Sequence, residues 1–557
     1  MEVKTKKSNT SFFKEAMIIS ISNFVVKIMG VLLKVSLTDV LGNAMGAFTS
    51  AYAIYAMLYM VSTSGLPVAI SKMIAEASQR GRKNETRRIF FLTTLIFGII
   101  GIVASLFMFL GADRIGAWTE HENAVLAMKV ISPTLFLICI ASAIRGYFQG
   151  LRYMVPTAVS QFIEAFVKVA LGLGGAFYAA SKGYSGAVQA AFATVGLTAG
   201  VFIGTIYLII YKAFSKKHVI NELDDECDSF GILGRRIAVI ALPVTITSSA
   251  LYLSSFMDTL VINRRLIASG YVKEMADALF SAYTSLSISI SELLPSTFVY
   301  PIAISILPFV SGALVAKKYD EAKKNMMNSI RISGLIALPC AAALCALARP
   351  CIGVIFGTDF SYSITLLDGT VKSPLDVAAP ALSILAIGIF FISMVSTTNA
   401  LLQACGNTML PVVSVLSGVV LLTICEILLV GNSKIGILGA PISSIVCYSV
   451  AFALNFAFLR KKQGLELNPI KLFGKNIISA AFCGAGAFGV YKLIFRFIGV
   501  ESRMNYLICL VPAGIVAVLI YVFFTLALKA TTYEEIELLP FGRTISAFLK
   551  KKNILRV

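Results

Sequence analysis

The sequence predicts an all-α polytopic membrane protein. Of the 557 residues, 57% are hydrophobic and 14% are charged, whereas a soluble domain carries roughly 25% charged residues. The mean hydropathy is +0.85. Apolar runs of about twenty residues, the length that crosses a bilayer as a helix, recur along the whole chain. The short polar–apolar alternation of an outer-membrane barrel is absent from the sequence.

Hydropathy predicts about fourteen membrane spans. We expect them at residues 15–38, 46–72, 87–112, 124–149, 155–181, 185–213, 237–263, 281–315, 330–356, 377–404, 409–430, 435–459, 472–497 and 504–529. No small-residue cleavage site follows the first run, so we expect it to be a retained helix and not a signal peptide.

The basic residues predict the orientation. Lysine and arginine cluster before the first span, in four connections and in the tail, as in Arg80–Arg88, Lys317–Lys324 and Arg460–Lys475. All these segments lie on one side if the number of spans is even; the exceptions are Arg264, Arg265 and Lys273. The positive-inside rule then places both termini in the cytoplasm, with the protein in the cytoplasmic membrane. The net charge of +19 therefore indicates loops facing anionic lipid, and we expect no nucleic-acid partner.

The sequence offers no metal or nucleotide site. The ten cysteines are scattered without CxxC spacing, and there are only two histidines. No GxxxxGK[ST] motif is present. We expect no cofactor and no metal, and an energy source other than ATP bound to this chain.

An internal repeat organises the spans. Leu66-Pro67 recurs 241 residues later as Leu307-Pro308, and the glycine pair Gly186 and Gly439, 253 residues apart, opens spans six and twelve. Spans one to six thus match spans seven to twelve as parallel repeats, as in transporters that bind cargo between two lobes. The predicted parts are an N-lobe at 1–214, a linker at 215–236, a C-lobe at 237–462, two further spans at 463–530 and an amphipathic cytoplasmic tail at 531–557.

Two lysines mark the first span. Lys27 and Lys34 lie seven residues apart, almost two helical turns, and so share one helix face. A lysine at the centre of a membrane helix costs about 2.5–3.5 kcal/mol. We interpret the pair as lining a polar cavity for an anionic cargo. The alternative is that each lysine pairs with a carboxylate or extends to the interface.

Other charged residues fall inside predicted spans. Glu164 and Lys168 are spaced i, i+4 in span five, one turn after Gln161, and either pair with each other or place Glu164 in the cavity. Asp258 in span seven and Glu292 in span eight are candidates to neutralise the first-span lysines across the cavity. They are also candidates to bind a coupling ion, Na⁺ or H⁺. In the alternative, their role is structural and they are buried counter-ions.

Two further features concern the ends of spans. Arg145, at the inner end of span four, has the position of an interfacial arginine. Ser64, Gly65 and Pro67 crowd the end of span two, where they predict either a hinge beside the cavity or close helix packing.

Four segments resemble a known family: Gly65–Ser78, Arg145–Ala170, Phe256–Tyr271 and Ile306–Ala313. They resemble the multidrug/oligosaccharidyl-lipid/polysaccharide exporter superfamily. Within it they are similar to the branch of stage V sporulation protein B and polysaccharide biosynthesis proteins, which is related to the lipid II flippases. The resemblance implies two six-helix lobes around a cavity plus two extra helices. It also implies outward flipping of undecaprenyl-pyrophosphate-linked sugars by alternating access.

The main hypothesis is therefore a flippase for a lipid-linked oligosaccharide, either a lipid II-like peptidoglycan precursor or a polysaccharide unit. We expect the protein to be a monomer surrounded by membrane lipids. The alternative is an ion-coupled multidrug exporter of the same superfamily, although two first-span lysines would repel a cationic drug. A membrane glycosyltransferase is a third class, for which the short loop at 357–376 provides no evident active site. The sequence does not specify the glycan, the coupling ion, or a role in sporulation, wall or capsule.

Overall fold

The chain is described from a computed structural model, which we use to place the predicted residues in space. The structure describes residues 22, 25–26, 28–30, 32–63, 65–151, 153–214, 227–295, 299, 310, 314, 317–360, 362–465, 468–537 and 546. Within this part of the chain, ten helices are long and apolar enough to cross a membrane. The helices form two compact units, residues 1–260 and 261–557.

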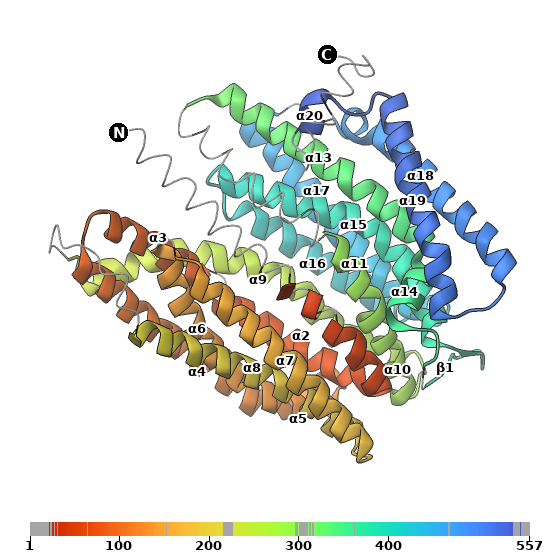
Figure 1. Cartoon of the computed structure of the whole chain (residues 1–557), viewed down its shortest axis with the longest axis horizontal. Coiled ribbons are helices and arrows are strands. Elements are labelled where there is room, and N and C mark those ends of the chain that lie inside the picture. The colour runs from red at the N-terminus through yellow and green to blue at the C-terminus, as the bar shows by residue number, and fades with distance from the viewer. Residues whose placement is uncertain are drawn as a thin grey trace. The chain divides into compact units, whose positions relative to one another are not determined.

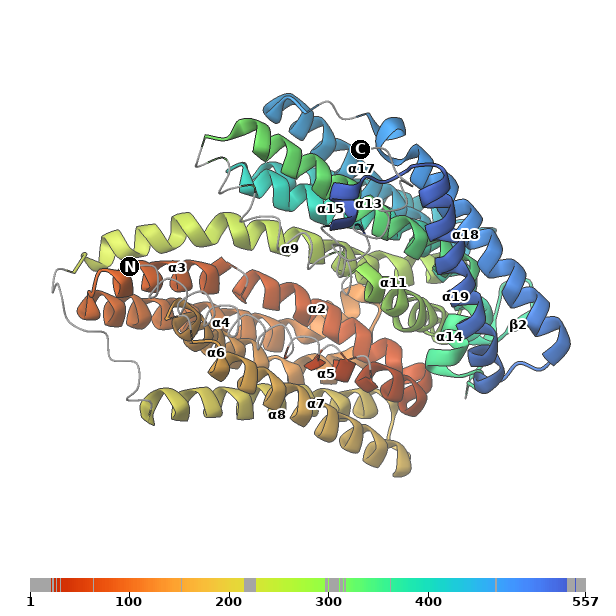
Figure 2. The same ribbon diagram turned by 45° about the horizontal axis from the view of Figure 1, so that its top comes forward.

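Unit 1 is a bundle of helices (Figures 1 and 2). Residues 32–41 are helical, and the following helices are α2 (Met45–Thr63), α3 (Gly65–Gln79), α4 (Lys83–Thr119), α5 (Val125–Ile131), α6 (Pro133–Gly150), α7 (Val155–Ser181), α8 (Gly186–Phe214) and most of α9 (Phe230–Ala268). The most extensive packing joins α7 to α8, and α6 packs on α3, α4 and α8. Large side chains such as Met45, Ile54 and Phe97 are fully or almost fully buried in the core.

Unit 2 repeats this order of packing. Its helices are α10 (Lys273–Ser281), α11 (Ser289–Leu294), α13 (Tyr319–Ala346), α14 (Ala348–Phe356), α15 (Pro374–Ala404), α16 (Leu410–Leu429), α17 (Gly439–Gln463), α18 (Pro469–Ile498), α19 (Arg503–Ala527) and α20 (Tyr533–Glu537). A π-helical turn, Ala282–Ile288, joins α10 to α11. The pairs α13–α15, α15–α17 and α16–α17 correspond in chain order to α4–α6, α6–α8 and α7–α8.

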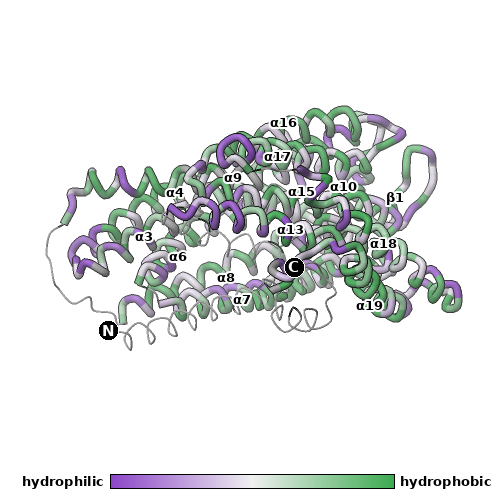
Figure 3. Tube along the Cα trace, turned by 90° about the horizontal axis from the view of Figure 1, so that it is seen from above, coloured by the Kyte–Doolittle hydropathy of each residue, from purple (hydrophilic) through white to green (hydrophobic). Residues whose placement is uncertain are grey.

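The last two spans form a helical hairpin within unit 2. Helices α18 and α19 pack along each other, and α18 also packs against α13. Figure 3 shows hydrophobic residues over most of both helices, as expected for surfaces in contact with lipid. The short helix α20 is fixed to α13, because Arg331 donates a hydrogen bond of 2.9 Å to the buried carboxylate of Glu535.

Local sequence explains where several helices begin and end. Asn468 accepts hydrogen bonds from the N–H groups of Ile470 and Lys471 at the start of α18, and Pro469 occupies the first turn, where it needs no partner. Helix α18 ends at Gly499, whose φ of +68° is a left-handed conformation that glycine adopts without steric cost.

The class predicted from the sequence is confirmed: this is a helical, multi-pass membrane protein. Described helices such as α7 (Val155–Ser181) follow the predicted spans, here the one at 155–181, whereas much of the spans predicted at 15–38 and 281–315 lies outside the described residues. One small sheet departs from the all-α prediction, the antiparallel hairpin of β1 (Ile364–Thr365) and β2 (Val371–Lys372). The compact units divide at Leu260, inside α9, and the lobe boundary at residue 237 stays a prediction.

Candidate functional site: a charged stripe on α7

Helix α7 carries a polar stripe inside the membrane. Ser160, Glu164 and Lys168 follow one another at four-residue spacing, with Gln161 beside them, so they occupy one face over about two turns. The helix begins at Val155 with Pro156 in its first turn. This stripe contains three of the residues that the sequence predicts to bind cargo or line the cavity, and the structure brings them together.

Glycines of α8 position this stripe. Gly196, Gly200 and Gly204 lie against the α7 backbone at Lys168, Glu164 and Ser160, so closely that an added Cβ at Gly200 would meet the Glu164 carbonyl oxygen at 2.6 Å. Small residues allow two membrane helices to approach to backbone contact. The glycine row therefore fixes the rotation of α7 about its axis, and with it the direction of the charged side chains.

The carboxylate of Glu164 pairs with Arg145 on α6. The guanidinium Nη2 donates to Glu164 Oε2 at 2.9 Å, and Nε donates to Ser160 Oγ at 3.1 Å. Arg145 is 8% exposed, and the Glu164 side chain is 25% exposed. The buried guanidinium of Arg145 thus donates two hydrogen bonds. Burying its charge without a partner would cost several kcal/mol, by order of magnitude. This pair neutralises Glu164.

The pairing leaves positive charge on the stripe. Lys168 is half-buried and forms no ion pair with any residue that the structure describes. The alternative in which Glu164 and Lys168 neutralise each other is therefore not the arrangement in the structure. The side-chain oxygen of Gln161 is buried and accepts no hydrogen bond from the described residues.

The described residues of the first predicted span pack beside this stripe. Ser22 donates a 3.0 Å hydrogen bond to the carbonyl oxygen of Ala158, and Leu33 lies beside Gly172. Ala158 and Gly172 are on α7, before and after the charged stripe. Lys34, which follows Leu33, is half-buried. Lys27 lies outside the described residues.

The remaining predicted residues are distributed over the two units. Asp258, on α9 within unit 1, is 6% exposed. Glu292, on α11 in unit 2, is exposed. Whether these carboxylates neutralise lysines or bind a coupling ion stays a prediction.

The end of span two is closely packed. Helix α3 begins at Gly65. A Cβ on Gly65 would lie 2.1 Å from the carbonyl oxygen of Ala241 on α9. Close packing thus accounts for Gly65, and Pro67 lies against Gly146, next to Arg145. Ser64 lies outside the described residues.

Sequence reasoning missed the role of Arg145. It interpreted this arginine as interfacial, which stays a prediction, and gave it no partner, whereas the structure buries it against α7 and pairs it with Glu164. Two signals were present in the sequence. Arg145 and Ser160 lie equally far from the short connection between α6 and α7, with Glu164 one turn after Ser160, and glycine recurs at every fourth residue from Gly196 to Gly204.

Membrane-length helices define a polytopic membrane protein, and the families that match it are transporters and not enzymes. The chain belongs to the polysaccharide biosynthesis protein family, whose family model matches residues 12–314. A second model, MatE, matches residues 243–427. Both are branches of the multidrug/oligosaccharidyl-lipid/polysaccharide exporter superfamily, and the resemblance seen in the sequence is confirmed.

Three proteins of Bacillus subtilis (strain 168) are similar along most of their length. The uncharacterized membrane protein YabM is 25% identical over 545 residues, covering 97% of this chain and 96% of YabM. Stage V sporulation protein B is 22% identical, covering 85% of this chain and 88% of that protein. The lipid II flippase MurJ is 20% identical, covering 92% of this chain and 95% of MurJ.

Solved structures share the fold. The inward closed conformation of the lipid II flippase MurJ matches with a TM-score of 0.65 at 14% identity, covering 92% of this chain and 99% of MurJ. An inward-facing multidrug MATE transporter matches with a TM-score of 0.63 at 15% identity, covering 81% of this chain and 98% of the transporter. The MurJ match extends over more of this chain than the MATE match.

Proposed function

We propose that this protein translocates an undecaprenyl-pyrophosphate-linked oligosaccharide across the cytoplasmic membrane by alternating access. The cargo is a lipid II-like peptidoglycan precursor or a related polysaccharide unit. Both termini lie in the cytoplasm, and the fourteen spans form two pseudo-symmetric lobes of six helices and a C-terminal pair. The shared packing order of the two units and the names of the flippase and sporulation relatives support this proposal.

The observation that carries the proposal is the excess of positive charge beside α7. Arg145 already neutralises Glu164 at 2.9 Å. Lys168 adds a cation that forms no ion pair with a described residue, and the sequence places Lys27 and Lys34 in the first predicted span. Cations that are costly to bury in a membrane mark a site for an anion. A pyrophosphate provides several acceptor oxygens for charge-assisted hydrogen bonds.

The mechanism follows from the same charges. In the proposed cycle, Lys27, Lys34 and Lys168 attract the pyrophosphate, and Gln161 donates a hydrogen bond to it from its side-chain amide. The Arg145–Glu164 pair holds α6 and α7 together as one rigid wall while the lobes rock. Neutralising Lys168 removes the cost of enclosing its charge, so the loaded cavity closes more readily than the empty one. The membrane potential, a coupled Na⁺ or H⁺, or consumption of the product outside drives net transport.

The alternative function is ion-coupled export of cationic drugs, supported by the MatE match and the MATE fold. The two functions need opposite charge in the cavity. A cationic drug would be repelled by the lysines and would need an unneutralised carboxylate, whereas Glu164 is paired with Arg145.

Translocation in proteoliposomes tests the proposal. Fluorescent lipid II, another undecaprenyl-pyrophosphate glycan and a cationic dye are each measured with the wild-type protein. Lys27→Ala, Lys34→Ala and Lys168→Ala are then compared at subsaturating cargo. We expect glycan transport without dye transport, and a loss of about tenfold or more for each lysine that contacts the pyrophosphate, because one charge-assisted hydrogen bond contributes about 1.5–3 kcal/mol.

Lys182→Ala is the matched control, because Lys182 is an exposed lysine immediately after α7. It should transport like the wild type. Unchanged glycan transport in all three stripe variants would refute the role of the lysines. Dye transport without glycan transport would instead establish the multidrug alternative.

A further inference from the structure

A long loop between α14 and α15 contains a cavity. Residues 357–373 leave α14 at Gly357, whose φ is +88°, and fold into the hairpin of β1 and β2. The cavity measures about 510 Å³, within the range of about 300–1,000 Å³ typical of sites for small ligands. Its lining includes Thr358, Asp359, Phe360, Tyr362, Lys372 and Ser373.

One wall of the cavity is aromatic and anchored. Tyr362 packs against the buried core of unit 2. Burial raises the pKa of Tyr362 to about 12, opposed by a hydrogen bond from the Ser281 hydroxyl, so the phenol is neutral. The ring of Phe360 meets that of Tyr362 edge to face, with centroids 6.5 Å apart. The two rings therefore present apolar surface in a fixed relative geometry.

The polar residue Ser373 of the lining and the hairpin beside it are also held in place. Ser373 caps α15 through reciprocal hydrogen bonds with Asp376, and Arg349 donates to Asp376 at 2.7 Å. At the hairpin turn, Asp368 accepts hydrogen bonds from the N–H and the hydroxyl of Thr370. These bonds hold the pKa of Asp368 below its usual range. A wall held in place before the ligand arrives reduces the entropy cost of binding.

The lining matches the chemistry of a saccharide. An aromatic ring packs on the apolar C–H face of a pyranose, while Asp359, Ser373 and Thr358 can exchange hydrogen bonds with its hydroxyl groups. The described lining residues carry one positive charge, Lys372, and one negative charge, Asp359, so the lining does not favour a phosphate or nucleotide. The hydroxyl groups and these two charges do not favour a purely apolar ligand either.

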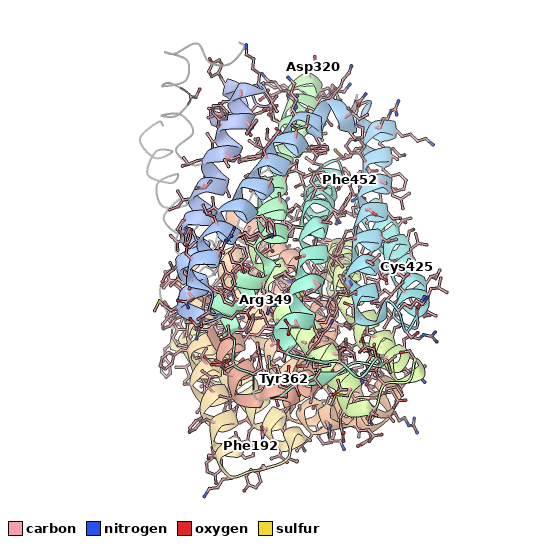
Figure 4. The ribbon with its side chains drawn as sticks, turned by 90° about the vertical axis from the view of Figure 1, so that its right-hand side faces the viewer. Phe192, Asp320, Arg349, Tyr362, Cys425 and Phe452 are labelled. Carbon is pink, nitrogen blue, oxygen red and sulfur yellow. The ribbon has the colours of Figure 1, made fainter. Side chains whose placement is uncertain are left out.

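We propose that this cavity binds a saccharide of one or two rings, supplied as the glycan of the lipid-linked cargo. This inference rests on the proposed function and adds a receiving site for the sugar. Tyr362 lies at the end of unit 2 away from Asp320 (Figure 4). The predicted orientation makes this the extracytoplasmic end, where the glycan arrives.

Saturation-transfer NMR tests the site. The full chain in nanodiscs is mixed with a soluble β-1,4-linked N-acetylhexosamine disaccharide, and transfer to the sugar ring protons is measured. We expect clear transfer with the wild type and a reduction of about fivefold or more with Phe360→Ala, which removes the stacking ring. Lys372→Ala, at an exposed position of β2, provides a second variant that does not disturb packing. Lys434→Ala, an exposed lysine in another loop, is the control.

The outcomes separate this site from the proposed function. Absence of transfer with the wild type, or equal transfer with Phe360→Ala and Lys372→Ala, would overturn the saccharide site. Lys34→Ala should bind the disaccharide normally, because the α7 stripe is not involved. Disaccharide binding without translocation by the wild type would defeat the proposed function alone. Unchanged translocation by a Phe360→Ala protein that no longer binds the disaccharide would overturn the cargo as the source of the sugar.

Discussion

The Arg145–Glu164 pair allows a quantitative test of the charged stripe. Arg145 is 8% exposed and donates to Glu164 at 2.9 Å. Glu164→Gln keeps an acceptor of the same shape and removes its charge. A charge-assisted hydrogen bond is worth about 1.5–3 kcal/mol and a neutral one about 0.5–1.5 kcal/mol, so the expected loss of stability is about 1–2 kcal/mol. Glu164→Ala leaves the guanidinium without this partner and should cost about 3–5 kcal/mol.

Thermal unfolding measures these losses. The single tryptophan of the chain, Trp118, lies on α4 in the same unit and reports unfolding by fluorescence. For a unit of 260 residues, 1 kcal/mol corresponds to about 2–4 °C in Tm, so Glu164→Gln should lower Tm by about 2–8 °C.

A double-mutant cycle isolates the pair. Arg145→Gln, Glu164→Gln and the double variant should give a coupling energy of about 1–3 kcal/mol. Lys168→Gln, one turn further along α7, is the control and should change stability by no more than about 0.5 kcal/mol. A coupling energy below about 0.5 kcal/mol would refute the view that the pair joins α6 to α7.

Two other contacts yield predictions. Gly196→Ala should destabilise the protein by several kcal/mol, by order of magnitude, because its Cβ would meet the backbone N of Gly172 at 2.2 Å. The control Gly174→Ala has open space around its Cβ. It should leave the stability unchanged or raise it by up to about 1 kcal/mol. Equal Tm values for the two variants would contradict the close contact of α7 and α8. Arg349 donates hydrogen bonds to Asp376 and Glu501 at 2.7 and 2.9 Å. Arg349→Gln should therefore lower the free energy of unfolding by about 1–3 kcal/mol and speed amide hydrogen exchange at residues 499–506. If the amides of Arg349→Gln exchange as slowly as those of a Lys434→Gln control, Arg349 does not hold the start of α19 in place.

The membrane spans could be predicted because hydropathy is a property of the chain itself. A helix in lipid needs about twenty apolar residues whatever its neighbours are, and helices such as α8 (Gly186–Phe214) and α16 (Leu410–Leu429) follow the expected ranges of 185–213 and 409–430. The stripe of Gln161, Glu164 and Lys168 was predictable for a similar reason, since helical spacing alone puts these residues on one face.

The partner of Glu164 could not be predicted in this way. The i, i+4 rule offers Lys168, but the glycine row of α8 fixes how α7 is rotated, and the connection of α6 to α7 then brings Arg145 to the carboxylate. Hydropathy does not encode that rotation, because a membrane helix is apolar on nearly every side. The cavity at the β1–β2 hairpin was missed because its lining residues, Thr358–Ser373, are individually unremarkable polar and aromatic residues.

The sequence by itself determined the membrane class, the approximate spans and the presence of charge inside them, because these depend on composition and on helical periodicity. Which charges pair depends on how the helices pack. Glu164 pairs with Arg145 and not with Lys168, because backbone contact between α7 and α8 sets the rotation of α7. That contact gives a neutral Arg145–Glu164 pair beside the cation of Lys168, the arrangement on which the proposed anion site rests.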